Sequence, residues 1–61
     1  MMEALLVWFQ ANGWAVGYHP TALSARRAGV ALLEPLCEDD CLADALRRLR
    51  CRCIRRMRRA A

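Results

Sequence analysis

Residues 14–27, with the sequence WAVGYHPTALSARR, decide between an α+β fold and an all-α fold. In the first five positions the larger side chains of Trp14, Val16 and Tyr18 alternate with smaller ones, which is the period of a half-buried strand. The next three residues, HPT, are typical of a turn, because Pro20 fixes its own φ and keeps the preceding residue out of the helical region. This segment therefore begins with a strand and then reverses direction.

The second half of this segment, residues 22–27, is compatible with two structures. Its alanines and arginines have high intrinsic helix propensity. A single strand at residues 14–18 would, however, leave its backbone donors and acceptors without partners. We therefore predict a β-hairpin, with Leu23 and Ala25 on the inner side, and an α+β fold. An all-α fold of three helices is the alternative.

The chain before the hairpin has the pattern of a helix. Within residues 2–10, Leu5, Trp8 and Phe9 share one helical face. Gly13 follows shortly after the last of them, where glycine commonly ends a helix. We expect this helix to pack its apolar face into the core.

After the hairpin the pattern is weaker. Residues 30–36 are mostly apolar, but Pro35 prevents one long helix. This segment is interpreted as a short helix or an irregular connector. Asp39 or Asp40 is then expected to cap a final helix that begins near Cys41.

The final helix, over residues 41–58, is amphipathic. Its apolar side chains recur at spacings of four, three, four and four, as on the buried face of a packed or paired helix. This stripe consists of Leu42, Leu46, Leu49, Cys53 and Met57. Its face is expected to pack against the first helix or against a second copy of the chain.

The 61 residues are enough for one domain, with an expected core over residues 2–57. The apolar content of 57% against 26% charged residues indicates a folded chain. A chain of this size buries only about 60% of its unfolded surface, so additional stabilisation is common. We therefore expect a homodimer.

The charge is strongly polarised along the chain. All ten basic residues are arginine, which is typical of GC-rich coding and points to a bacterial or phage source. Residues 44–61 contain eight arginines and one carboxylate, a net charge of +7, whereas residues 1–43 carry −3. The basic end, residues 47–61, predicts an anionic partner: a nucleic acid, an acidic protein segment or, as the weakest alternative, a membrane surface.

No residue pattern indicates an enzyme, a metal site or a cofactor. His19 is the single histidine, and the three glycines are too scattered to cradle a phosphate. Among the four cysteines, Cys41 and Cys51 would lie about 15 Å apart along a continuous helix, too far for a shared zinc ion. Cys51 is expected to be an exposed thiol and Cys53 a core residue.

A membrane-spanning segment is not expected. The longest apolar run, residues 4–9, is far shorter than the roughly 20 residues that a spanning helix needs. No positively charged segment precedes it, as would be required of a secretion signal. The sequence therefore predicts a cytoplasmic protein.

The order of these elements resembles a known family. The segments G13-W14-A15-V16 and L23-S24-A25-R26-R27-A28-G29-V30, between two helices, are similar to the β-hairpin docking domains represented by the N-terminus of the tubulysin synthetase subunit TubC. The resemblance covers about residues 5–49. It implies a homodimer of helix, two strands and further helices, which recognises a short acidic tail added beside the second strand. Carried over to this chain, the basic side chains that hold the tail would be Arg26 and Arg27.

We predict a small non-enzymatic protein–protein interaction module, a regulator or inhibitor that docks on a larger cytoplasmic protein. Binding of an acidic segment by adjacent arginines on an edge strand would fit this function. The alternative is a nucleic-acid-binding protein that uses the final helix, which lacks the asparagine and glutamine that would read adenine. The candidate partner-binding residues are Arg26, Arg27, Leu42, Leu46, Leu49, Arg47, Arg48, Arg55 and Arg56.

Overall fold

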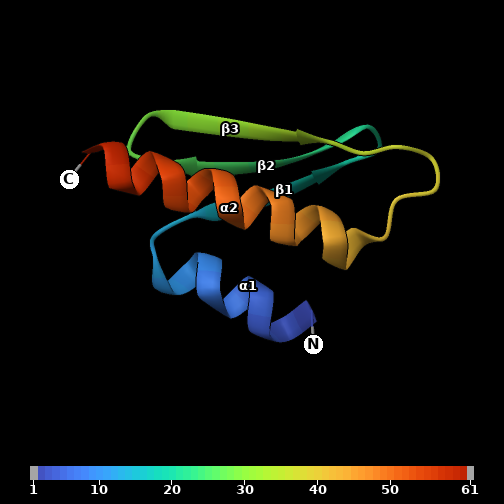
Figure 1. The fold of residues 1–61 in the computed structure, drawn as a ribbon, viewed down its shortest axis with the longest axis horizontal. Coiled ribbons are helices and arrows are strands. Elements are labelled where there is room, and N and C mark those ends of the chain that lie inside the picture. The colour runs from blue at the N-terminus through green and yellow to red at the C-terminus, as the bar shows by residue number, and fades with distance from the viewer. Residues whose placement is uncertain (1, 61) are drawn as a thin grey trace.

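The computed structural model, which describes residues 2–60, is a small α+β domain, and the all-α alternative is wrong (Figure 1). Three antiparallel strands form a sheet in the order β1-β2-β3, and the two helices pack on the same face of it. The elements are α1 (Met2–Ala11), β1 (Ala15–His19), β2 (Ala22–Arg27), β3 (Val30–Pro35) and α2 (Leu42–Ala60).

Helix α1 ends as its sequence predicts. Gly13 has a φ of 79°, in the left-handed region that suits the residue after a helix. The side-chain amide of Asn12 donates to the Trp8 carbonyl at 2.8 Å, and the Trp14 N–H donates to the Phe9 carbonyl at 2.9 Å. The last helical carbonyls are thereby satisfied, and the chain turns directly into the sheet.

Strands β1 and β2 form the predicted hairpin. Val16 pairs with Ala25 and Tyr18 with Leu23, so these residues share the face covered by the helices. Leu23 and Ala25 are buried, in agreement with the sequence prediction. Tyr18 is nevertheless 68% exposed, because it lies near the end of the strand.

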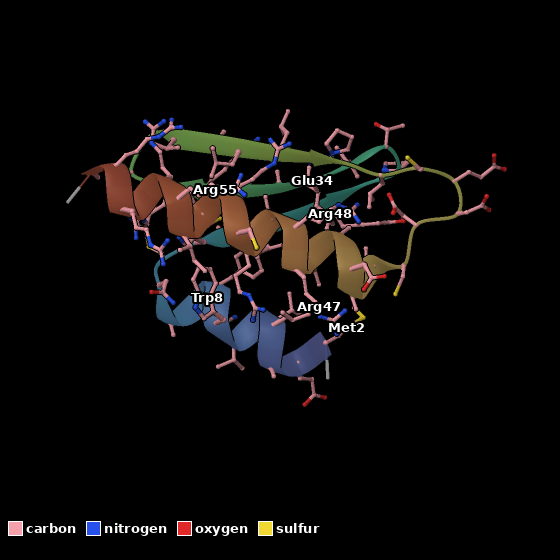
Figure 2. All side chains as sticks on the ribbon, in the orientation of Figure 1. Met2, Trp8, Glu34, Arg47, Arg48 and Arg55 are labelled. Atoms are coloured by element: carbon pink, nitrogen blue, oxygen red, sulfur yellow. The ribbon has the colours of Figure 1, made fainter. Side chains whose placement is uncertain are left out.

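Strand β3 corrects the prediction of a short helix or connector. It joins β2 through a two-residue turn in which Ala28 and Gly29 have φ values of 49° and 80°, as a type I′ hairpin requires. Its pairing with β2 directs Leu32 and Glu34 to the helical face and Leu33 to the open face. Glu34 therefore lies between β3 and α2 (Figure 2).

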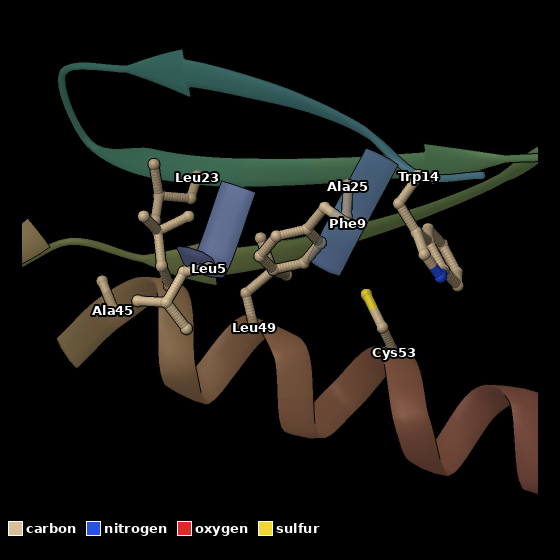
Figure 3. Packing of buried hydrophobic residues seen from close by; sticks show 9 residues of the cluster. Leu5, Phe9, Trp14, Leu23, Ala25, Ala45, Leu49 and Cys53 are labelled. Atoms are coloured by element: carbon tan, nitrogen blue, oxygen red, sulfur yellow. The ribbon is translucent and has the colours of Figure 1, made fainter. Parts of the chain in front are cut away.

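Helix α2 buries its apolar stripe in its own domain. Leu46, Leu49 and Cys53 are fully or almost fully buried, while Leu42 and Met57 are half-buried. Figure 3 shows Leu49 and Cys53 pointing toward Phe9 and the sheet. The full set of buried apolar residues is Leu5, Phe9, Trp14, Leu23, Ala25, Ala45, Leu46, Leu49 and Cys53.

The start of α2 also differs from the expectation that Asp39 or Asp40 caps it. The Ala45 N–H donates to the Cys41 carbonyl at 3.0 Å. Asp40 instead accepts a hydrogen bond from the Cys37 N–H at 2.7 Å through Oδ2. This carboxylate therefore orders the β3–α2 loop.

Neither α1 nor α2, within residues 2–60, is both long and apolar enough to cross a membrane.

Candidate anion-binding surface of helix α2

Two arginines in the first half of α2, Arg47 and Arg48, are bound to carboxylates of the same chain. Arg47 Nη1 lies 2.7 Å from Asp44 Oδ1. Arg48 contacts two acids, with Nε 2.9 Å from Glu34 Oε2 and Nη2 3.2 Å from Asp40 Oδ2. Arg48 therefore holds α2 to β3 and to the preceding loop, whereas the Arg47 pair lies within the helix.

Glu34 is the centre of this network. Glu34 is only 7% exposed. Its Oε2 contacts Arg48, and its other carboxylate oxygen, Oε1, lies 2.9 Å from Arg52 Nε. Arg48 and Arg52 are one helical turn apart, so both reach the same carboxylate from above β3. A buried carboxylate is costly unless it is paired. The two arginines therefore allow β3 to place an acid on its inner face.

The ion pairs also shift the titration of their members. The Cys37 N–H bond, followed by the charge of Arg48, lowers the pKa of Asp40 below its usual value. The hydrogen bond to Glu34, with the charge of Asp40, raises the pKa of Arg48. Both shifts favour the charged forms that make the network.

The remaining arginines of α2, apart from Arg52, have no carboxylate within ion-pair distance among residues 2–60. All but Arg50 of this group are well exposed. These arginines are Arg50, Arg55, Arg56, Arg58 and Arg59. Their positive charge is thus not neutralised within the described part of the fold.

Several of these side chains surround a shallow cleft of about 280 Å³ between β3 and α2. We call it the arginine cleft, lined by Leu32, Arg52, Arg55, Arg56 and Arg59. The arginines recur at i, i+3, i+4 and i+7, so one flank of the helix presents them all. Figure 2 shows Arg55 on this flank, toward β3, and Arg47 on the opposite side, toward α1. Four guanidinium groups around one hollow favour an anion.

The structure divides the predicted arginines between these two regions. Arg55 and Arg56 line the arginine cleft. Arg47 and Arg48 belong to the ion-paired region instead. Arg52 and Arg59, which were not among the predicted site residues, complete the cleft; their helical spacing is the signal that would have identified them.

Arg26 and Arg27 do not lie on an edge strand, which corrects that prediction. Strand β2 is central, with β1 and β3 on either side, so no peptide strand can add next to it. Arg27 Nη1 donates to the Asn12 carbonyl at 3.0 Å, and its guanidinium lies 4.7 Å from the Trp14 ring centre. Arg27 therefore stabilises the α1–β1 connection, whereas Arg26 is exposed on the open face of the sheet.

The leucines predicted to contact a partner are also mostly unavailable. Leu46 and Leu49 are buried in the core of their own chain, so they cannot form a partner surface while the domain is folded. Leu42 is half-buried beside this core. The open question of whether the stripe faces its own fold or a second copy is thereby answered in favour of its own fold.

The cysteines are not linked by disulfides, and Cys53 alone is buried. Burial raises the pKa of the Cys53 thiol to about 11, although the charge of Arg27 acts in the opposite direction. Cys51 is exposed, as predicted. Across residues 2–60 no three histidine, cysteine or acidic side chains gather closely enough to hold a metal ion.

Comparisons with protein-family models, curated proteins and solved structures give no match to this chain. The resemblance to TubC-type docking domains stays a prediction, and the site must be interpreted from its own chemistry.

Proposed function

We propose that this chain is a small non-enzymatic interaction module that binds an acidic segment of a larger protein through the arginine cleft. The observation that carries the proposal is the convergence of four arginines on one hollow, of which only Arg52 contacts a carboxylate. Bidentate guanidinium groups match carboxylates in geometry and charge. As a regulator or inhibitor, the module would act by occupying the surface that presents this segment.

The lining of the arginine cleft favours a protein over a nucleic acid. Leu32 gives the cleft an apolar floor beside the charges, which suits a segment that mixes acidic and aliphatic side chains. None of its lining residues is aromatic, so it has no platform on which a base could stack. The proposal retains the acidic partner implied by the docking-domain resemblance and moves its site from Arg26 and Arg27 to the cleft.

Nucleic-acid binding is the second candidate, and one observation favours it. Arg50 and Arg58 also have no carboxylate partner among the described residues, and they extend the basic surface beyond the arginine cleft. A phosphate backbone could follow such an extended surface.

We place the protein in the cytoplasm as part of the proposal, since its four thiols are unpaired and thiols stay reduced there.

The test is a fluorescence-anisotropy titration with a short labelled peptide of alternating glutamate and valine, and with a labelled DNA duplex. Replacing Arg52, Arg55, Arg56 and Arg59 together by glutamine should weaken peptide binding by about 100-fold or more, because hydrogen bonds between charged groups are lost. Tighter binding of the duplex than of the peptide, with a steep loss between about 50 and 200 mM salt, would contradict the protein-binding proposal and support the second candidate.

A further inference from the structure

The outer edge of β3 carries backbone groups that the sheet does not use. The Leu36 N–H donates to the Thr21 carbonyl at 2.9 Å, and hydrogen-bonded positions in an antiparallel pair alternate. Val30, Leu32 and Glu34 therefore bond to β2, whereas the N–H and C=O groups of Ala31 and Leu33 point away from it. Within residues 2–60 no strand pairs with this side of β3.

The protection that edge strands usually have is confined here to the end of β3. Ala31 and Leu33 are uncharged and exposed, and Leu33 is 56% exposed on the open face. Pro35, which has no N–H to donate, stands only at the last position of the strand. The inward-pointing charge of Glu34 also lies near this end, so residues 30–33 are the unprotected part of the edge. An unpaired apolar edge is a template for pairing with another strand. In Figure 1, β3 forms one border of the molecule, while α1 lies on the side of β1.

The charges beside this edge are arranged as a complementary pair. Helix α2 runs opposite to β3: Glu34, near the end of β3, contacts Arg48, near the start of α2. The arginine cleft lies farther along the helix, beside Leu32. Glu34 is itself neutralised by Arg48 and Arg52, but the exposed acids Glu38 and Asp39 follow in the loop after β3. Acidic groups therefore border one end of the β3 edge, and arginines without a carboxylate partner among residues 2–60 border the other. A second β3 placed antiparallel would bring unlike charges together at both ends.

We propose that two copies of this chain pair through their β3 edges, antiparallel and centred on Leu32, to form one continuous six-stranded sheet. In this register Ala31 lies opposite Leu33 of the second copy, and each such pair exchanges both of its backbone hydrogen bonds. Registers that place Pro35 within the paired stretch lose a donor. Glu34 of the second copy then lies opposite Val30, so the loop that follows it, with the exposed Glu38 and Asp39, extends toward the arginine cleft.

The charge complementarity determines the kind of dimer to expect. A short edge-to-edge contact buries less than the roughly 800 Å² per partner of a standard interface, so the dimer should dissociate on dilution. Its ion pairs lie at the rim and are screened by salt. The dimer does not depend on the partner proposed above, but both would use the arginine cleft and should therefore compete.

The test is sedimentation equilibrium of the full chain over a concentration series, with Leu33→Pro as the edge variant. The Leu33 N–H points away from β2, so this substitution leaves the existing ladder intact. Because the dimer is twofold symmetric, the Leu33 N–H bond to the other copy occurs twice, and the substitution removes both. One net hydrogen bond is worth roughly a fivefold change in an equilibrium constant. The dissociation constant should therefore rise by about 30-fold.

The matched control is Tyr18→Pro, which removes an outward N–H from the opposite edge of the sheet, on β1, and should leave the dissociation constant unchanged. Circular dichroism checks that both variants fold. If Leu33→Pro does not fold, Leu33→Lys replaces it, because it brings like charges close to the twofold axis. A monomer at every concentration, or equal weakening by the β1 and β3 variants, would overturn the proposal. Binding of the glutamate–valine peptide by a chain that shows no self-pairing would support the function proposed above and overturn the dimer.

Discussion

The two halves of α2 both carry arginines but differ in what surrounds those arginines. In the first half, Arg47 and Arg48 contact acids supplied by the helix itself, the preceding loop and β3. In the second half, Arg55 and Arg59 line the arginine cleft and contact no carboxylate among residues 2–60. The comparison shows that a basic helix is not a binding surface by its charge alone. The neighbouring elements decide which arginines are structural and which are free for a partner.

The core beneath the helix shows the same difference, and it gives the largest expected effect. Leu49, in the first half, is fully buried, whereas Met57, in the second, is only half-buried. Leu49→Ala should lower the free energy of unfolding by about 3 kcal/mol, and Met57→Ala by about 1 kcal/mol, because the cavity left at the surface can fill with water. Urea denaturation measures both. Equal losses would mean that the two halves are anchored alike.

The buried carboxylate gives the next effect. Glu34→Ala leaves Arg48 and Arg52 without their shared acid, although both remain partly exposed to water. The free energy of unfolding should fall by about 1–2 kcal/mol, less than for a fully buried pair. Glu38→Ala is the control: this exposed residue makes no ion pair within the described chain, and its substitution should change stability by less than about 0.5 kcal/mol. A larger loss at Glu38 than at Glu34 would contradict the role of the β3–α2 network.

The smallest expected effect is that of the Cys53 thiol on stability, and it is seen only at alkaline pH. Burial raises the pKa of the Cys53 thiol from 9.0 to about 11, so the unfolded chain loses this proton first as the pH rises. The contribution of Cys53 to stability is therefore complete below pH 9 and is lost as the pH approaches 11. Urea denaturation over this range should show the loss in the wild type and in Cys51→Ala, but not in Cys53→Ala. A decline of equal size in Cys53→Ala would assign it to other groups.

The predictable parts of the fold were those in which sequence periodicity and burial agree. The alternation from Trp14 to Tyr18 correctly predicted β1, and the apolar stripe correctly predicted α2. The side of α2 that faces its own core followed from the spacing of Leu46, Leu49 and Cys53. The spacing could not show what the apolar stripe packs against, because a helix paired with a second copy has the same spacing of apolar residues.

Strand β3 could not be predicted because its alternation breaks at its last residues. Leu33 lies on the open face and Glu34 on the buried one, so at this step the usual order of apolar inside and polar outside is reversed. This reversal depends on Arg48 and Arg52, which are distant in sequence. Once β3 was missed, β2 became an edge strand in the prediction, and Arg26 and Arg27 were wrongly placed at an edge.

The most direct test of the account compares two double variants that remove the same charge. The affinity of the glutamate–valine peptide is measured by fluorescence anisotropy for Arg55→Gln with Arg59→Gln, and for Arg47→Gln with Arg48→Gln. The first pair should raise the Kd by about tenfold or more, while the second should leave it within about twofold. Equal weakening by both pairs would contradict the account, because binding would then follow net charge and not the arginine cleft.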